Sequence, residues 1–408
     1  MLTDRKLRIL FVEEQHSDEL RFIVSGMGDE WDVEFGDDAA RALDSMRRDP
    51  YDIVLSAPDM HLGADERLLQ TVKTSFPQSV RIVMTEQDGG DIFVDQVDFA
   101  HQQISRPFDL LTLRSVIDRA TEIHGIVADP ALRYVLADIR ALPSLPSLYL
   151  QIVEELDSDD PSIRRVGEIV AGDIGMSTKV LQVANSVLFG ARVRISDPIQ
   201  ATVQLGADLV KSLVLMTKVF DQCDETAIGE AALTELVDHS LRVGARARAI
   251  CRVERFDREI CDMAFTAGLL HDVGKMILAT NLPDTFAAAR EIAKERDVPD
   301  WLAEKEVFGA THAEIGAYLT GLWGLPEPLF RAILDHHSPL QSCEMEFGPL
   351  AAIHAADAID HGFLDRDEGG APELSDAPVD GGLWFDRTWL SDLGVADRLD
   401  EWARLGEG

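Results

Sequence analysis

The segment AGLLHDVGK at residues 267–275 places a histidine, an aspartate and a lysine at the end of an apolar run. Upstream, Met263, Ala267 and Leu270 recur at four- and three-residue spacing, which predicts a helix with His271 on its apolar face. An imidazole and a carboxylate buried side by side need partners, either other side chains or a metal ion. The segment therefore predicts a helical domain with a polar centre.

More histidines and a second aspartate fall on apolar faces of other expected helices. His312 precedes Ile315 at helical spacing, and Asp357 follows Ile353. The candidate metal ligands are His239, His271, Asp272, His312, His336, His337 and Asp357. Such mixed nitrogen and oxygen donors suit Mn, Fe or Zn better than Ca²⁺ or Mg²⁺.

Two alternatives to a metal site stay open. Any one of these histidines could be an ordinary core histidine bonded to a backbone carbonyl or a carboxylate. The whole set could also form a metal-free network, in which Asp272 accepts hydrogen bonds from a protonated His271 or His312 and Lys275 stays exposed. His354 and His361, which flank Asp357, are interpreted as structural.

Helical periodicity extends over residues 130–361, outward from the opening segment. Prolines fall where first turns should begin and glycines where helices should end: Pro146, Pro161 and Pro198, then Gly206, Gly229 and Gly324. Residues 365–382 are rich in glycine, proline and acidic side chains, which indicates a loop. Leu390, Leu399 and Trp402 then predict short helices that dock back on the helical domain.

In the first 125 residues the apolar side chains follow a different pattern. Short apolar runs alternate with helical patterns, which predicts βαβ units and a parallel sheet covered on both faces. The expected strands are RILFV at 8–12, DVEF at 32–35, DIVLS at 52–56, VRIVMT at 80–85 and QQIS at 102–105.

The amino-acid composition limits which partners and which location are expected for this protein. The 408 residues carry 73 acidic and 38 basic side chains, a formal net charge of −35, which disfavours direct contact with nucleic acid or an anionic membrane. No apolar run is long enough to cross a bilayer, and the N-terminus lacks a signal-peptide core, so we expect a cytoplasmic protein. Four cysteines without CxxC spacing suggest ordinary thiols.

The helical region from about residue 133 to 360 resembles the HDOD family of the HD superfamily. The motifs that carry the resemblance are LPSLP (142–146), DIGMSTKVLQVANSVLFG (173–190), ISDPIQATVQLG (195–206), HS (239–240), AGLLHDVGK (267–275), FGATHAEIGAYL (308–319), GLP (324–326), ILDHH (333–337) and HAADAI (354–359). The resemblance implies a non-catalytic relative of the HD phosphohydrolases that transmits signals through protein contacts.

The same resemblance also implies an enzymatic alternative. In an active HD enzyme, metal-bound water attacks a phosphate ester, Asp272 would bridge or orient it, and Lys275 would hold a phosphate oxygen. The related HD-GYP phosphodiesterases act on cyclic dinucleotides, but HHSPLQSCEMEFG at residues 336–348 carries no GYP element. The catalytic residues are therefore unknown, and a non-enzymatic protein is the leading interpretation.

The first 125 residues resemble the receiver domain of two-component response regulators. Its phosphorelay site corresponds here to Glu13, Glu14, Ala57, Thr85 and Arg106. Ala57 replaces the aspartate that accepts the phosphoryl group, and an arginine replaces the usual lysine. We expect Glu13 and Glu14 to form a solvated acidic patch with at most weak cation binding, and Asp59 to be a solvated loop carboxylate.

Together these observations predict three regions. Residues 1–125 form a receiver-like α/β domain with a flavodoxin-like, doubly wound, five-stranded parallel sheet. Residues 126–364 form an all-α HDOD domain, and residues 365–408 form an acidic loop and C-terminal helices packed on it. We expect regulatory protein partners, no membrane insertion, and a homodimer through an exposed face around Phe93, Val94, Leu110, Leu113 and Val116.

Overall fold

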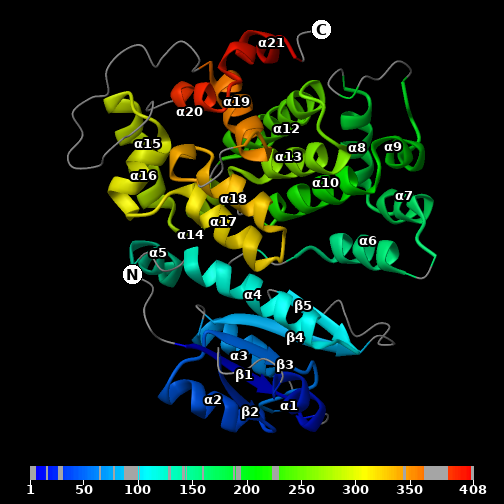
Figure 1. Ribbon diagram of the computed structural model, residues 1–408, viewed down its shortest axis with the longest axis vertical. Coiled ribbons are helices and arrows are strands. Elements are labelled where there is room, and N and C mark those ends of the chain that lie inside the picture. The colour runs from blue at the N-terminus through cyan, green and yellow to red at the C-terminus, as the bar shows by residue number, and fades with distance from the viewer. Residues whose placement is uncertain are drawn as a thin grey trace. The chain divides into compact units, whose positions relative to one another are not determined.

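The short apolar runs of the N-terminal region form one parallel sheet in the computed structural model (Figure 1). The strands are β1 (Leu7–Val12), β2 (Trp31–Gly36), β3 (Ile53–Ser56), β4 (Val80–Glu86) and β5 (Gln102–Arg106), and each coincides with an expected strand to within two residues. The order β2-β1-β3-β4-β5 is that of a flavodoxin-like sheet. All four pairings are parallel, so the carboxyl ends of the strands meet at one edge.

Helices connect the first four strands: α1 (Ser17–Ser25), α2 (Ala39–Arg48) and α3 (Leu68–Ser75). Two further helices, α4 (Leu110–Ile126) and α5 (Pro130–Asp138), follow β5. Leu10 and Val54 point to one face of the sheet, where they pack with Met46 of α2 and Val72 of α3. Ile9 and its neighbours at alternate positions point to the other face and are also buried. Burial on both faces explains why these strands are continuous apolar runs.

The structure describes residues 6–14, 17–25, 31–63, 66–76, 79–86, 100, 102–126, 130–139, 143, 145–158, 160–186, 189, 194–222, 229–342, 346–362 and 385–405. Among these residues, no helix is both long enough and apolar enough to cross a lipid bilayer.

From residue 146 onward the described residues are helical. The helices are α6 (Ser147–Asp157), α7 (Ile163–Ala171), α8 (Ile174–Ala184), α9 (Pro198–Leu205), α10 (Ala207–Phe220), α12 (Glu230–Val253), α13 (Arg258–Leu270), α14 (Val273–Asn281), α15 (Pro283–Arg296), α16 (Asp300–Phe308), α17 (His312–Leu322), α18 (Glu327–Asp335), η3 (Pro339–Gln341), α19 (Pro349–His361), α20 (Arg387–Asp392), η4 (Ala396–Arg398) and α21 (Leu399–Ala403). Local signals set many of these boundaries. Pro198 occupies the first turn of α9, and Asp257 caps α13 by accepting a hydrogen bond from the Ile260 amide (2.9 Å).

The helices α12 and α13 form the centre of this region, and α12 also packs on α19 (Figure 1). Their backbones touch where a glycine of one helix meets a glycine of the other. A Cβ atom added to Gly244 would lie 2.8 Å from the carbonyl oxygen of Phe265, and one added to Gly268 would lie 2.6 Å from the Cα of Gly244. Only glycine permits this approach.

The described end of the chain lies against α12 and α19. The indole Nε1 of Trp402 donates to Glu254 Oε1 (2.9 Å), and Arg398 forms an ion pair with the same carboxylate (3.0 Å). The amide of Asp386 donates to His354 Nε2 (2.9 Å). Trp402 itself is fully buried, so this segment completes the core of the helical region.

Gly229 directly precedes α12, and residues 223–228 before it lie outside the described residues, so its expected place at a helix end stays a prediction. One expectation is wrong. Leu113 is fully buried, so it is not part of an exposed dimer face, and Phe93 and Val94 lie outside the described residues. The chain separates into two units, residues 1–145 with 318–325 and residues 146–317 with 326–408. The boundaries near residues 125 and 364 remain predictions.

Candidate metal centre and degenerate receiver site

The edge of the sheet formed by the strand ends gathers the residues that match a receiver site. Glu13 follows β1, Ala57 follows β3, Thr85 lies in β4 and Arg106 ends β5. Arg106 Nη2 lies 2.5 Å from Glu13 Oε2, and both side chains are at least nine-tenths buried. The expected solvated patch is therefore wrong for Glu13, whose carboxylate is neutralised by a guanidinium from the chain, whereas Glu14 and Asp59 are exposed as expected.

In the helical region the seven candidate ligands gather in two adjoining groups. One group is Asp272, His312, His336 and His337, and the other is His239, His271 and Asp357. Within each group, one donor atom per residue lies within 4.8 Å of the others. Sequence positions more than a hundred residues apart thus supply one polar centre inside an apolar core.

Helix ends deliver most of these side chains. His271 caps the C-terminus of α13, Asp272 caps the N-terminus of α14, and His336 follows α18. The glycine in HDVGK has a steric role, because a Cβ at Gly274 would overlap the carbonyl oxygen of His312. The absence of a side chain at Gly274 therefore lets the start of α14 approach the first residue of α17.

Each of four histidines is held through its Nδ1 atom. His271 Nδ1 pairs with Gly268 O (2.8 Å) and His336 Nδ1 with Ile333 O (2.6 Å). Because a carbonyl oxygen only accepts, Nδ1 carries the proton in both rings, and a neutral ring then leaves Nε2 as an acceptor. These Nε2 atoms face the centre, the orientation that a metal ligand needs.

Two carboxylates hold the other two rings, and neither was among the residues predicted from the sequence. Glu304 Oε2 pairs with His312 Nδ1 (2.7 Å) and also accepts from the His312 amide (2.7 Å). Asp360 Oδ2 pairs with His239 Nδ1 (2.8 Å). Glu304 is 1% exposed, so its charge is buried behind His312. Carboxylate partners of this kind fix the ring orientation of metal-binding histidines and raise their basicity.

Several donor atoms at the centre have no hydrogen bond among the described residues. Asp272 Oδ1, His336 Nε2 and Asp357 Oδ1 are all buried in this way, although Asp272 Oδ1 lies 3.1 Å from His312 Nε2 and Asp357 Oδ1 lies 3.2 Å from His239 Nε2. In addition, His239 Nε2 lies 3.3 Å from His271 Nε2, and His312 Nε2 lies 3.0 Å from His337 Nε2. Two nitrogens bound to one tetrahedral zinc at ~2.0–2.1 Å would be about 3.3 Å apart. The residues therefore fit a divalent transition metal.

When no metal ion is bound, the protonation of the histidines at this centre depends on their burial and on the carboxylates beside them. Burial lowers the pKa of His271, and it lowers the pKa of His336 well below its usual range. Burial also opposes protonation of His312, but the neighbouring Glu304 carboxylate raises the pKa of that ring to about 9. In the metal-free network, His312 and not His271 is therefore the protonated partner of Asp272, with His312 Nε2 3.1 Å from Asp272 Oδ1.

Lys275 occupies a different position from the one expected. Its Nζ donates to Asp272 Oδ2 (2.9 Å), and its side chain is 15% exposed. Burial acts to lower its pKa, but the Asp272 charge leaves the pKa raised, so the ammonium stays charged. Lys275 therefore stabilises the Asp272 carboxylate, and an exposed Lys275 is wrong.

The two flanking histidines differ from each other. His354 is structural, because its Nδ1 donates to the carbonyl oxygen of His336 (2.7 Å) and its Nε2 accepts from the Asp386 amide. His361 Nε2 instead lies 3.4 Å from Asp357 Oδ1 at the more exposed side of the centre. His361 is therefore a further candidate ligand that the sequence interpretation set aside.

Comparison with known proteins supports the assignment of the helical region. Residues 142–339 match the model of the HDOD domain, so this part of the chain is an HDOD domain. An uncharacterized protein of Treponema pallidum (strain Nichols) is 27% identical over 256 residues. That match covers 62% of this chain and 48% of the relative, so the chain matches about half the length of that protein.

Two solved structures illustrate the likeness of the two regions. An HDOD domain protein of unknown function from Geobacter sulfurreducens has a TM-score of 0.48 and 26% identity, covering 67% of this chain and 97% of its own. The signal receiver domain of an HD domain-containing protein from Pseudomonas fluorescens Pf-5 has a TM-score of 0.27 and 21% identity. It covers 30% of this chain and 91% of its own.

Proposed function

We propose that this chain, whose residues 142–339 are an HDOD domain, is a signalling protein that acts by binding a regulatory protein. The observation that carries the proposal is the buried Arg106–Glu13 ion pair beside Ala57. A receiver needs a carboxylate nucleophile, a cation held by acidic residues and a mobile ammonium group. Here a methyl group stands in place of the nucleophile and the buried acid, Glu13, is already paired, which supports binding as the function of this unit.

The proposal includes a resident divalent transition metal, Mn, Fe or Zn, in the HDOD domain. His336 Nε2 supports it, because this buried acceptor has no hydrogen bond among the described residues and a cation would satisfy it. His239, His271 and Asp357 would hold one ion, and Asp272 with His312, His336 and His337 would hold an ion in the adjoining group. Such an ion would fix the ends of α13, α14 and α18 and so stabilise the partner-binding domain.

A metal-dependent phosphohydrolase acting on a nucleotide or cyclic dinucleotide is the alternative. The complete set of seven ligands favours it. Two observations weigh against it: Lys275, the residue expected to hold a phosphate oxygen, is bound to Asp272, and no GYP element follows the paired histidines. His271 and Asp272 are also almost fully buried, whereas a hydrolytic metal centre keeps a position open to substrate.

The two functions are separated by activity and capture measurements on the full chain. The protein would be loaded in turn with Mn²⁺, Fe²⁺ and Zn²⁺ and assayed on cyclic dinucleotides and model phosphodiesters. Turnover that is lost in Asp272→Ala would establish the enzyme and overturn the adaptor. The adaptor instead predicts no turnover together with a protein partner captured by cross-linking in the native cell.

Surface variants sharpen the capture experiment. Ile174, at the first turn of α8, is 86% exposed although it is a large apolar side chain. Ile174→Lys should reduce capture if this part of the HDOD domain is the contact, and Phe22→Lys on α1, where Phe22 is 80% exposed, is the matched control in the other unit. The homodimer remains part of the proposal, and light scattering of the full chain at high micromolar concentration tests it.

A further inference from the structure

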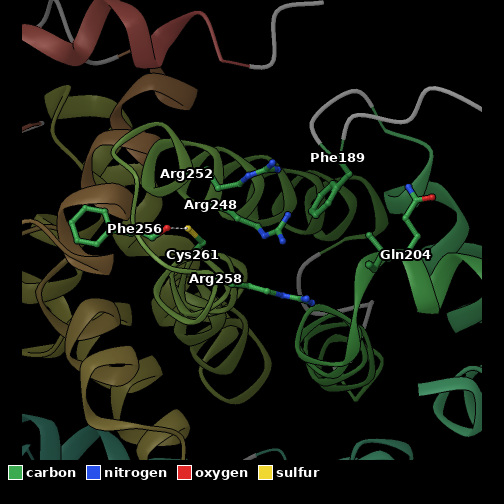
Figure 2. A pocket seen from close by; sticks show the side chains of 8 residues that line it. Phe189, Gln204, Arg248, Arg252, Phe256, Arg258 and Cys261 are labelled. Carbon is green, nitrogen blue, oxygen red and sulfur yellow. Dashed lines mark hydrogen bonds between the residues drawn. The ribbon is translucent and has the colours of Figure 1, made fainter. Parts of the chain in front are cut away.

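A pocket lies in the HDOD domain, and the residues that line it are not part of the metal centre. Its volume is about 490 Å³, within the range typical of small-ligand sites. The lining residues are Phe189, Gln204, Leu205, Arg248, Arg252, Phe256, Arg258 and Cys261. Figure 2 shows the guanidinium groups of Arg248, Arg252 and Arg258 extending toward one side of the pocket.

The pocket is locally basic in a strongly acidic chain. Arg248 and Arg258 share one buried carboxylate through their Nε atoms: Arg248 Nε lies 2.8 Å from Asp262 Oδ1, and Arg258 Nε lies 3.1 Å from Asp262 Oδ2. Three arginines thus line the pocket, and the Asp262 carboxylate forms ion pairs with two of them. Asp262 binds these two arginines through their Nε atoms and not through their terminal nitrogens.

Fixed geometry supports the arginines. Gly206, which separates α9 from α10, has a positive φ of 92°, and a Cβ there would overlap the guanidinium of Arg258. Arg248 and Arg252 stand one helical turn apart on α12, so their side chains reach the same side of the helix. The helices α12 and α13 therefore fix the spacing of the three guanidinium groups.

Phe189 gives the pocket an aromatic ring on the side toward which the arginines extend in Figure 2. The guanidinium carbon of Arg248 lies 5.4 Å from the ring centre of Phe189, and Phe189 packs edge to face on Phe265 (5.6 Å). The Phe256 ring lies on the other side in Figure 2 and stacks on Phe347 (5.3 Å), and Cys261 Sγ donates to the Phe256 carbonyl oxygen (3.6 Å; dashed in Figure 2). The carboxamide of Gln204, on the opposite side in Figure 2, can both donate and accept.

We propose that this pocket binds a nucleotide, that is, a phosphorylated ligand with an aromatic base. Arginine forks bind phosphate oxygens in a bidentate manner, the ring of Phe189 can pack on a base, and the amide of Gln204 can pair with the base edge. A bare anion would leave Phe189 without a role, and an uncharged ring would leave the arginines without one.

This site is distinct from the metal centre. Arg258 and Cys261 lie in the first turn of α13, whereas His271 caps its other end. At ~1.5 Å per residue, the two ends of this helix are about 20 Å apart. The inference therefore does not depend on whether a metal is bound or whether the protein is an adaptor or an enzyme.

Titration calorimetry of the full chain tests the proposal. The probes are guanosine 5′-monophosphate, adenosine 5′-monophosphate, the two parent nucleosides, and inorganic phosphate. At least one nucleotide should bind with one-to-one stoichiometry and a Kd below about 1 mM. The parent nucleosides and inorganic phosphate should each bind at least tenfold more weakly, because each lacks one half of the recognised ligand.

Variants locate the binding. Arg252→Gln and Arg258→Gln should each weaken nucleotide binding about tenfold, as expected for loss of a charge-assisted hydrogen bond. Arg248 is left intact so that Asp262 keeps a cation, and melting temperatures confirm folding. Arg290→Gln, an exposed arginine of α15, is the matched control and should leave the Kd within twofold.

Three results would overturn the assignment. The first is the absence of saturable binding of either nucleotide at millimolar concentration. The second is binding of inorganic phosphate as tight as that of the nucleotide, which would show that Phe189 does not contribute to recognition. The third is nucleotide binding that neither Arg252→Gln nor Arg258→Gln changes, which would place the ligand elsewhere.

Discussion

The two polar sites of this chain have opposite internal arrangements. At the edge of the sheet, a cation from the chain itself occupies the acidic site, since Arg106 binds Glu13 at 2.5 Å. In the HDOD domain, the histidines are fixed through Nδ1 while buried atoms such as His336 Nε2 lack hydrogen bonds. A buried acidic site can therefore be neutralised by a long basic side chain of the same protein, or its ligand atoms can be left available for an external metal ion.

The largest expected effect is on metal content. His271→Ala with Asp272→Ala removes one ligand from each group and should abolish the stoichiometric Mn, Fe or Zn of the full chain. Elemental analysis of protein purified without chelator or a histidine tag measures this. Glu14→Gln, at the exposed acid of the sheet edge, is the control and should leave the metal content unchanged.

If the parent protein carries well under one metal per chain even after reconstitution, the metal-free network is correct. The double variant would then only lower the melting temperature. Metal lost from Glu14→Gln instead would place the ion at the sheet edge and reverse the comparison.

The second effect is on the stability of the sheet. Arg106→Met removes the cation from a buried carboxylate, which should cost about 3–5 kcal/mol in the free energy of unfolding. Hydrogen exchange of the β1 and β5 amides in the full chain localises the loss. The double variant Glu13→Gln with Arg106→Met should recover much of it, and equal destabilisation in both variants would contradict a coupled pair.

The third effect is on metal affinity through a residue outside the ligand set. Glu304→Gln keeps the shape of the side chain but removes the charge behind His312, which should weaken metal binding roughly 10–100-fold. Competition with a chelator measures the affinity. Glu306→Gln, two residues along the same helix and paired with Arg296, is the matched control. Equal affinities in the two variants would make Glu304 a structural acid only.

The smallest expected effect is that of a phosphoryl donor on the sheet edge, where we expect none. Incubation of the full chain with acetyl phosphate and Mg²⁺, followed by intact-mass measurement, should show no adduct because Ala57 offers no nucleophile. An adduct that disappears in Asp59→Asn would instead identify the exposed Asp59 as a replacement acceptor and reopen this site.

The sequence was sufficient for the elements and for most of the metal ligands, because both depend on local periodicity. The change of period near residue 129 separates sheet from helices, and the seven candidate ligands all reach one centre because each lies on an apolar helix face or at a helix end. Their partners could not be predicted in this way. Arg106 meets Glu13 across 93 positions, and Glu304 meets His312 from another helix, contacts that depend on packing angles and not on spacing.

The backbone contact of Gly244 with Gly268 has a mechanical consequence. Sliding either helix along the other would bring a residue with a Cβ atom into the place of a glycine, so this contact fixes the register of α12 on α13. His239 and Arg248 lie on either side of the contact, each roughly 6–8 Å along α12 from Gly244 at the usual helical rise. The two glycines, which carry no functional group, therefore set where both of these side chains stand relative to α13.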